Sequence, residues 1–180
     1  MAHISLGNDL PGISGLMSYR PETGLALSGL AEVLLRGPNT LTRGERELIA
    51  AYVSRLNECA FCASSHSAFA AAQLPEGMPL VSQVCADLEQ APVSAKLKAL
   101  LRVAAKVPQG GKAVTTADVA AAREAGASDV EIHDTVLIAA AFCMFNRYVD
   151  GLGTFAPADP AGYQQAAERI VTEGYLAPAH

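Results

Sequence analysis

The chain has 180 residues, of which 51% are hydrophobic, and its formal net charge of −5 comes from 18 acidic and 13 basic side chains. This length fits one domain, or one domain built from two similar halves. No run of Lys or Arg stands out, which argues against a nucleic-acid partner, because phosphate backbones are bound by clustered positive charge. A membrane-spanning protein is not expected either, since the apolar runs are well below the roughly 20 residues that a spanning helix needs.

The chain is also more apolar than one small core requires. Its mean hydropathy is +0.23, and apolar residues in excess predict surface that is buried between subunits, so we expect a homo-oligomer. The N-terminus lacks the basic stretch and apolar run of a secretory signal, so the cytoplasm is the expected compartment. There, the four cysteines are expected to be catalytic, metal-binding or buried rather than a disulfide framework.

The first elements are an arm and a helix. Residues 1–24 are rich in Gly, Pro and Ser and predict an extended arm with turns. A short helix is expected over residues 25–35, ended by Gly37 and the proline after it. The clearest helix start follows, where Thr42 and Glu45 form a capping-box pattern.

The helix that opens at this pattern is expected to run to about Leu56. Apolar residues recur along it at helical spacing, at Leu48, Ile49, Tyr52, Val53 and Leu56. Glu47 lies on the other side, among small residues that let a neighbouring helix approach closely. We therefore expect the Glu47 carboxylate to be partly buried, which is unusual for this residue type.

The rest of the pattern is helical too. A break at Asn57 and Glu58 precedes predicted helices over residues 59–73, 80–88, 95–107, 116–125 and 128–149, and a short helical piece over 164–172. The predicted N-caps are Ser94, Thr116 and Ser128, the last in a capping box with Glu131. No alternating run is long enough for a strand. The prediction is one all-α domain over residues 1–180, with an arm (1–24), a helical core (25–153) and a tail (154–180).

A weak internal repeat connects the two halves of this core. Residues 48–57 align with residues 137–146, and the first four residues and the final Asn are identical. We interpret this as two helical halves related by duplication. The second copy has Val136 where the first has Glu47, and it lacks a CxxC pair, so only the first copy is expected to carry chemistry.

The segment E-C-A-F-C-A-S-S-H carries the most specific signal. Cys59, Cys62 and His66 are spaced by three and four residues, which places their side chains on one face of a helix. The first turn of a helix favours a thiolate, so this pair suits reversible dithiol–disulfide chemistry, with the imidazole moving protons. Cys59 is nearer the helix start, whereas Cys62 has the better spacing to His66, so spacing alone leaves the attacking thiol open.

Other interpretations of these residues remain. The three side chains could be core filler, or they could bind zinc with Glu47 as the fourth ligand, although three ligands on one helix make an awkward tetrahedron. Cys85 and Cys143 are expected to be buried small hydrophobes. For Asn146 and the arginine after it we expect a structural or interface role.

The chain resembles the alkylhydroperoxidase D-like proteins of the carboxymuconolactone decarboxylase superfamily, most closely their peroxidase-related branch. The resemblance rests on residues 41–66, LTRGERELIAAYVSRLNECAFCASSH, where the family signature corresponds to Glu47, Cys59, Cys62 and His66. Residues 115–153 also resemble the later helices of the family, and the resemblance covers about residues 10–155.

This resemblance implies six or more helices, often with a two-halves repeat, assembled as trimers or larger rings such as hexamers. It implies peroxide reduction in which Cys62 attacks with His66 as its base, Cys59 resolves the sulfenic acid and Glu47 acts on the proton network. No bound cofactor or metal is implied; the reductant would be an external dithiol, such as a lipoyl-bearing adaptor or a thioredoxin-like protein. Phe61 stands where the characterised type has a second His, so a relay through that His cannot be complete.

Two other functions compete with a peroxidase. A redox sensor or scaffold could use the same disulfide without turnover. A lactone decarboxylase of the same superfamily is disfavoured, because that branch lacks the CxxC pair.

Overall fold

Helices form the framework of the molecule. The computed structural model describes residues 2–177, and within that range it contains nine α-helices, two short 3₁₀ turns and no β-strand. The predicted all-α fold is therefore confirmed. None of the helices in this range is both long and apolar enough to cross a membrane. In chain order the α-helices are α1 (Gly12–Tyr19), α2 (Pro21–Arg36), α3 (Arg43–Leu56), α4 (Ala60–Ala71), α5 (Gly77–Ala86), α6 (Ala95–Lys106), α7 (Thr116–Glu124), α8 (Asp129–Gly151) and α9 (Pro160–Glu173).

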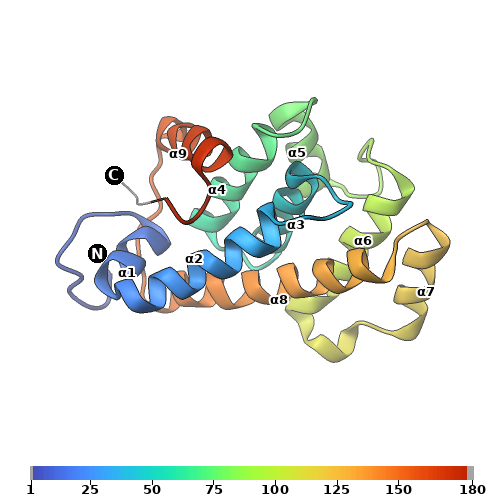
Figure 1. Cartoon of the computed structure of the whole chain (residues 1–180), viewed down its shortest axis with the longest axis horizontal. Coiled ribbons are helices and arrows are strands. Elements are labelled where there is room, and N and C mark those ends of the chain that lie inside the picture. Colours follow the sequence, from blue (N-terminus) through green and yellow to red (C-terminus); the bar gives the residue numbers. More distant parts are fainter. Residues whose placement is uncertain (1, 178–180) are drawn as a thin grey trace.

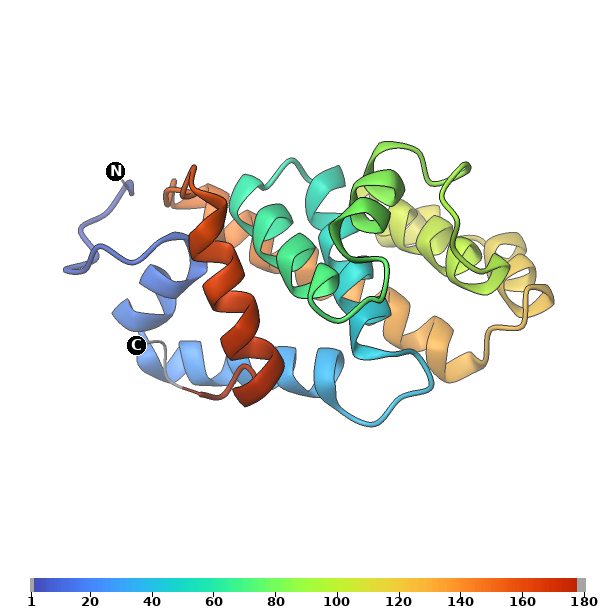
Figure 2. The same cartoon turned by 90° about the horizontal axis from the view of Figure 1, so that it is seen from above.

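Helix α8 runs along the long axis of the molecule (Figure 1). Helices α1 and α9 lie toward one end of the molecule and α6 and α7 toward the other (Figures 1 and 2). Helix α3 packs against both α4 and α8 at the centre. Fully buried apolar side chains fill this centre: Leu48, Ile49, Leu100, Leu101, Ile138 and Phe142. Each contributes about 1.5–3 kcal/mol of burial free energy, so the helices that carry the candidate site are held by the main core.

Capping boxes fix the starts of the two central helices. Thr42 and Glu45 form the predicted reciprocal pair at the start of α3, and Ser128 and Glu131 form the other predicted pair at the start of α8. The predicted cap of α6 by Ser94 is also present.

One other predicted N-cap and one predicted helix start were wrong by a few residues. Thr115, not Thr116, caps α7, because its side chain and that of Asp118 satisfy each other's backbone amides. Helix α5 begins at Gly77, ahead of the predicted start. Pro79 lies in the first turn of α5, where proline is tolerated because the missing N–H has no intrahelical partner.

The predicted N-terminal arm over residues 1–24 is wrong in its second half. Helix α1 occupies Gly12–Tyr19, and α2 begins at Pro21 rather than at residue 25. Leu16 of α1 is completely buried. Pro21 stands at the first helical position, where its fixed φ favours a helix, so the Gly and Pro content that indicated an arm belongs to helix starts.

The C-terminal segment contains a longer helix than predicted, since only a short helical piece over residues 164–172 was expected in the tail. Helix α9 begins at Pro160, where the Asp159 side chain accepts a hydrogen bond from the Ala161 amide. It packs against α4, and its buried residues Tyr163 and Ile170 join a small second core. Residues 178–180 of the predicted tail lie outside the described residues.

The two aligned segments lie in α3 and α8, which pack against each other. The final Asn residues of the two segments are in contact, because the Asn57 side-chain amide donates to the side-chain oxygen Oδ1 of Asn146 over 2.8 Å. Asn146 is fully buried and also donates to Ser54. This contact gives Asn146 the structural role expected for it; duplication of the two halves stays a prediction.

Candidate functional site

The cysteine pair lies at the junction of α3 and α4. The predicted break is present, and Glu58 there has a φ of 59°, a left-handed conformation that is uncommon for a residue other than glycine. The turn places Cys59 at the N-cap of α4 and Cys62 within its first turn. Both side chains are buried, at 0% and 3% exposure, and both are free thiols.

The pKa values of the two thiols are shifted in opposite directions. Hydrogen bonds from the Cys62 side chain and backbone lower the pKa of Cys59. The partnership with Cys59, together with burial, raises the pKa of Cys62, while Asn146 acts to lower it. Asp150 of α8 acts to raise the pKa of both thiols. Of the two thiols, Cys59 therefore has the greater thiolate character.

Glu47 is the second centre of the site. It is 1% exposed, which is deeper than the partial burial predicted from its place on the small-residue face of α3. Its Oε2 lies 2.7 Å from Nδ1 of His66, and its Oε1 accepts a 2.5 Å hydrogen bond from the Tyr175 hydroxyl. A buried carboxylate needs such donors, because an unpaired buried charge is costly. An ionised Glu47 can only accept, so Nδ1 of His66 carries a hydrogen and Nε2 is left for other partners.

Tyr175 is a residue that the sequence analysis missed. It follows α9 and lies 128 positions from Glu47, and no spacing or motif connects the two. Its backbone N–H donates to Glu32 over 2.8 Å, and Arg36 holds both Glu32 and the Ile170 carbonyl. Burial and the facing Glu47 charge raise the pKa of Tyr175 well above its ordinary value, so the phenol stays protonated and donates.

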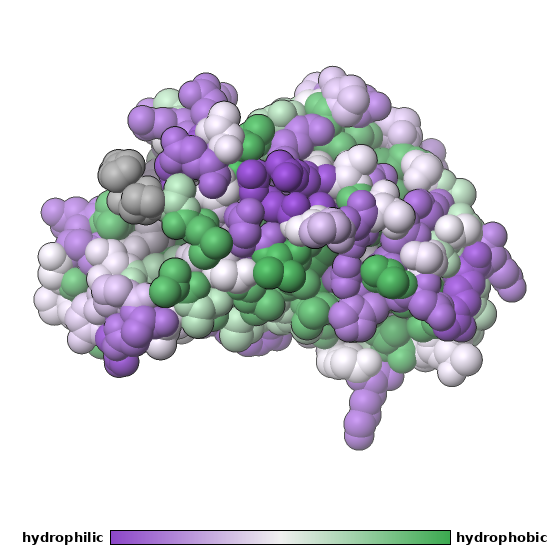
Figure 3. All heavy atoms as spheres, viewed as in Figure 1, coloured by the Kyte–Doolittle hydropathy of each residue, from purple (hydrophilic) through white to green (hydrophobic). Residues whose placement is uncertain are grey.

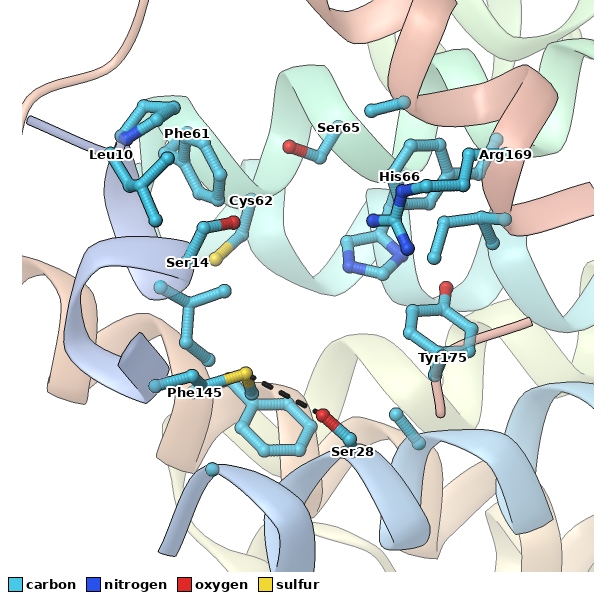
Figure 4. A pocket seen from close by; sticks show the side chains of 18 of the residues that line it. Leu10, Ser14, Ser28, Phe61, Cys62, Ser65, His66, Phe145, Arg169 and Tyr175 are labelled. Carbon is cyan, nitrogen blue, oxygen red and sulfur yellow. Dashed lines mark hydrogen bonds between the residues drawn. The ribbon is translucent and has the colours of Figure 1, made fainter. Parts of the chain in front are cut away.

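A cavity of about 560 Å³ gives access to one thiol. Its wall comes from α1, α2, α4, α8, α9 and the segment after α9, and includes Cys62, His66 and Tyr175. Figure 4 shows these three side chains around the cavity. Cys59 is not part of the wall; it packs beside Val149 in a small apolar cluster.

The predicted site residues are thus brought together as two linked pairs. Cys59 and Cys62 form one pair and Glu47 and His66 the other, and α4 carries the pocket-facing member of each. The side chains that shift the pKa of Cys62 are those of Cys59, Asn146 and Asp150, and His66 is not among them. Cys62 and His66 both line the cavity, so a molecule bound there can contact both side chains.

The remaining predictions concern metal ligands and the other cysteines. Within residues 2–177 no group of three His, Cys, Asp or Glu side chains is arranged to hold a metal ion. Cys85 and Cys143 pack against the main core as small hydrophobes, as predicted, but both are partly buried rather than buried. Cys143 accepts a hydrogen bond from Asn57, which keeps it near the surface of the α3–α8 contact.

Phe61 takes the place of the second family His on the cavity wall. Its ring packs at 6.1 Å from that of Tyr163. It also lies against Gly12, where a Cβ would come within 2.2 Å of the ring. Gly12 has a φ of 53°, so both its conformation and this close approach require glycine. The position supplies an apolar wall instead of a proton carrier.

Part of the chain matches the model of a known protein family. Residues 21–74, which include all four predicted site residues, match the model of the Carboxymuconolactone decarboxylase family. None of the curated proteins matches the chain. A structure described as an alkylhydroperoxidase AhpD core, an uncharacterized peroxidase-related protein from Ralstonia eutropha JMP134, is similar with a TM-score of 0.77 at 25% identity, over 94% of this chain and 83% of that one.

A second similar structure is an uncharacterized peroxidase-related protein from Silicibacter sp. TM1040. Its TM-score is 0.76 at 27% identity, over 86% of this chain and 78% of that one. The family match over residues 21–74 and the shared fold support the resemblance to AhpD-like proteins of the carboxymuconolactone decarboxylase superfamily. The family resemblance found in the sequence is confirmed.

Proposed function

We propose that this protein is a thiol-dependent alkylhydroperoxidase that reduces organic hydroperoxides through a Cys59–Cys62 dithiol–disulfide cycle. The observation that carries the proposal is the position of Cys62. It lies on the wall of a cavity, in the first turn of a helix, and in one small buried cluster with a second, shielded thiol. The peroxidase-related relatives of the same fold support the reaction class.

The first step is attack by Cys62 on the terminal oxygen of the hydroperoxide. An S–O bond forms, the O–O bond breaks, and the alcohol leaves with a proton, so that Cys62 becomes a sulfenic acid. His66 lines the same cavity and is oriented by Glu47, so its free nitrogen can accept the proton that Cys62 loses. The same nitrogen then returns this proton to the departing alkoxide, so Cys59, whose pKa is lowered, stays available as a thiolate for the second step.

The second step makes the disulfide. The Cys59 thiolate attacks the Cys62 sulfur, an S–S bond forms, and the sulfenic oxygen leaves as water. Two electrons from an external dithiol then restore both thiols, through a mixed disulfide. A protein dithiol, such as a lipoyl-bearing adaptor or a thioredoxin-like protein, is the proposed donor.

The test is consumption of tert-butyl hydroperoxide by the pure protein with dihydrolipoamide as reductant. We expect turnover in the wild type, loss of it in Cys62→Ser, and loss of sustained turnover in Cys59→Ser because the sulfenic acid is not resolved. Cys143→Ser is the matched control and should retain activity, since Cys143 lies outside the cavity wall.

Turnover that persists in Cys62→Ser would contradict the proposal. A wild type without turnover, in which Cys59 and Cys62 still join under mild oxidant, would favour the redox sensor instead.

A further inference from the structure

The cavity is larger and more apolar than a hydroperoxide group alone requires. Its volume of about 560 Å³ lies within the range of about 300–1,000 Å³ typical of sites for drug-sized ligands. Aliphatic and aromatic side chains make up most of the wall, among them Leu10, Ile13, Met17, Phe69, Phe142 and Phe145. A ligand that fills this space must therefore have a sizeable apolar body.

One fixed charge faces this apolar space. Among residues 2–177, Arg169 of α9 is the only Lys or Arg on the wall, and no Asp or Glu in that range lines it. Figure 4 shows the Arg169 guanidinium directed into the cavity, on the side of His66 and Tyr175. The positive charge is therefore presented to whatever occupies the cavity.

The Arg169 guanidinium also has hydrogen-bonding capacity to spare. Within residues 2–177 its recorded bond is a long one, 3.4 Å from Nη1 to the Ala177 carbonyl, and no carboxylate is within ion-pair distance. The nearby Arg36 differs, because it pairs with Glu32 and donates to two backbone carbonyls. A guanidinium carries five N–H donors in a planar fork that matches a carboxylate.

From these observations we infer that the cavity binds an amphipathic carboxylate, with its apolar chain or ring among the aliphatic and aromatic side chains and its carboxylate on Arg169. This inference rests on the proposed function and narrows it, because the substrate becomes the hydroperoxide of an apolar organic acid. The charge-assisted pair between Arg169 and the carboxylate supplies affinity and fixes the direction in which the ligand enters.

The test measures binding without turnover. Decanoate and decanol, which share the chain and differ in charge, are titrated by calorimetry into the reduced wild type, Arg169→Gln, Arg169→Lys and Arg55→Gln. Arg55 is an exposed arginine away from the cavity wall and serves as the matched control. Thermal melting of each variant confirms that it is folded.

We expect decanoate to bind the wild type and Arg55→Gln equally, and to bind Arg169→Gln about tenfold more weakly, as loss of a hydrogen-bonded charge pair predicts. Arg169→Lys should bind better than Arg169→Gln because it keeps the charge. Decanol should bind all four proteins with similar, weaker affinity.

Three results would overturn the inference: no decanoate binding to the wild type, equal binding of decanoate and decanol, or equal decanoate binding by Arg169→Gln and the wild type. None of them bears on peroxidase activity, which is measured with the small, uncharged tert-butyl hydroperoxide. Failure of this inference and failure of the proposed function are therefore distinguishable.

Discussion

At the scale of single residues, the site depends on how two buried groups are satisfied. The Cys62 thiol, whose pKa is raised, lies beside Cys59, whose pKa is lowered. The Glu47 charge is held by His66 on one oxygen and by Tyr175 on the other. The sequence predicted Cys59, Cys62 and His66, because they lie at helical spacing at the start of one helix. It predicted Glu47 from its place on the small-residue face of α3 and in the family signature. It gave no signal for Tyr175, whose contact arises only when α9 packs onto α4.

Tyr175→Phe tests whether this contact positions the catalytic groups. The change removes one donor from a buried carboxylate, so we expect the unfolding free energy to fall by about 1–2 kcal/mol. We also expect kcat for tert-butyl hydroperoxide to fall and the pH dependence of kcat to shift, because Glu47 orients His66. The measurements are a urea melt and a pH–rate profile.

The matched control is Tyr163→Phe, since Tyr163 also lines the cavity but donates to the Pro157 carbonyl instead of Glu47. An unchanged pH profile in Tyr175→Phe, with stability alone reduced, would limit Tyr175 to a structural role.

At the scale of elements, the sequence predicted what local chemistry determines. The capping boxes of α3 and α8 and the break before α4 were found because each is set by neighbouring residues. The segments before α2 and after α8 were misjudged because proline and glycine were interpreted as loop signals. Pro21 and Pro160 instead stand at helix starts, and tertiary packing of α1 and α9 against the core decides their structure.

The start of α8 gives a prediction for acid stability. Burial of the Glu131 carboxyl raises its pKa, but hydrogen bonds from Lys96, the Ser128 amide and Thr40 outweigh this and lower it to about 2. A carboxyl with a lowered pKa in the fold stabilises it above the unfolded value of about 4.3. That contribution is lost as the pH falls through the folded value of about 2.

Glu131→Gln keeps a capping box but removes the charge that pairs with Lys96. We expect it to lower the unfolding free energy at neutral pH by about 1–2 kcal/mol and to flatten the loss of stability between about pH 4.3 and pH 2. Chemical denaturation across this range is the measurement. An equally steep acid transition in Glu131→Gln would exclude this carboxyl as its source.

At the scale of the whole molecule, helices distant in sequence combine to enclose one cavity. The wall needs α1, α2, α4, α8 and α9 together, so neither its size nor its apolar character could be predicted from any one segment. The cysteine motif predicted the chemistry, but only the assembled fold separates a pocket-facing thiol from a shielded one. That separation favours Cys62 as the attacking residue, a choice that spacing left open.

The outer surface bears on the predicted homo-oligomer. Apolar residues gather on the face shown in Figure 3, over α2 and α8. The large hydrophobic side chains that these helices expose include Leu25, Val33, Leu137 and Met144. Assembly through such a surface, as a trimer or a hexamer, stays a prediction.

The most direct test of the account is to locate the sulfenic acid. Each single variant, Cys59→Ser and Cys62→Ser, is treated with one equivalent of tert-butyl hydroperoxide in the presence of a dimedone-type probe, and the adduct is mapped by mass spectrometry. We predict labelling at Cys62 in Cys59→Ser and none in Cys62→Ser. Labelling of Cys59 in Cys62→Ser, with none in Cys59→Ser, would contradict the assignment of Cys62 as the attacking thiol.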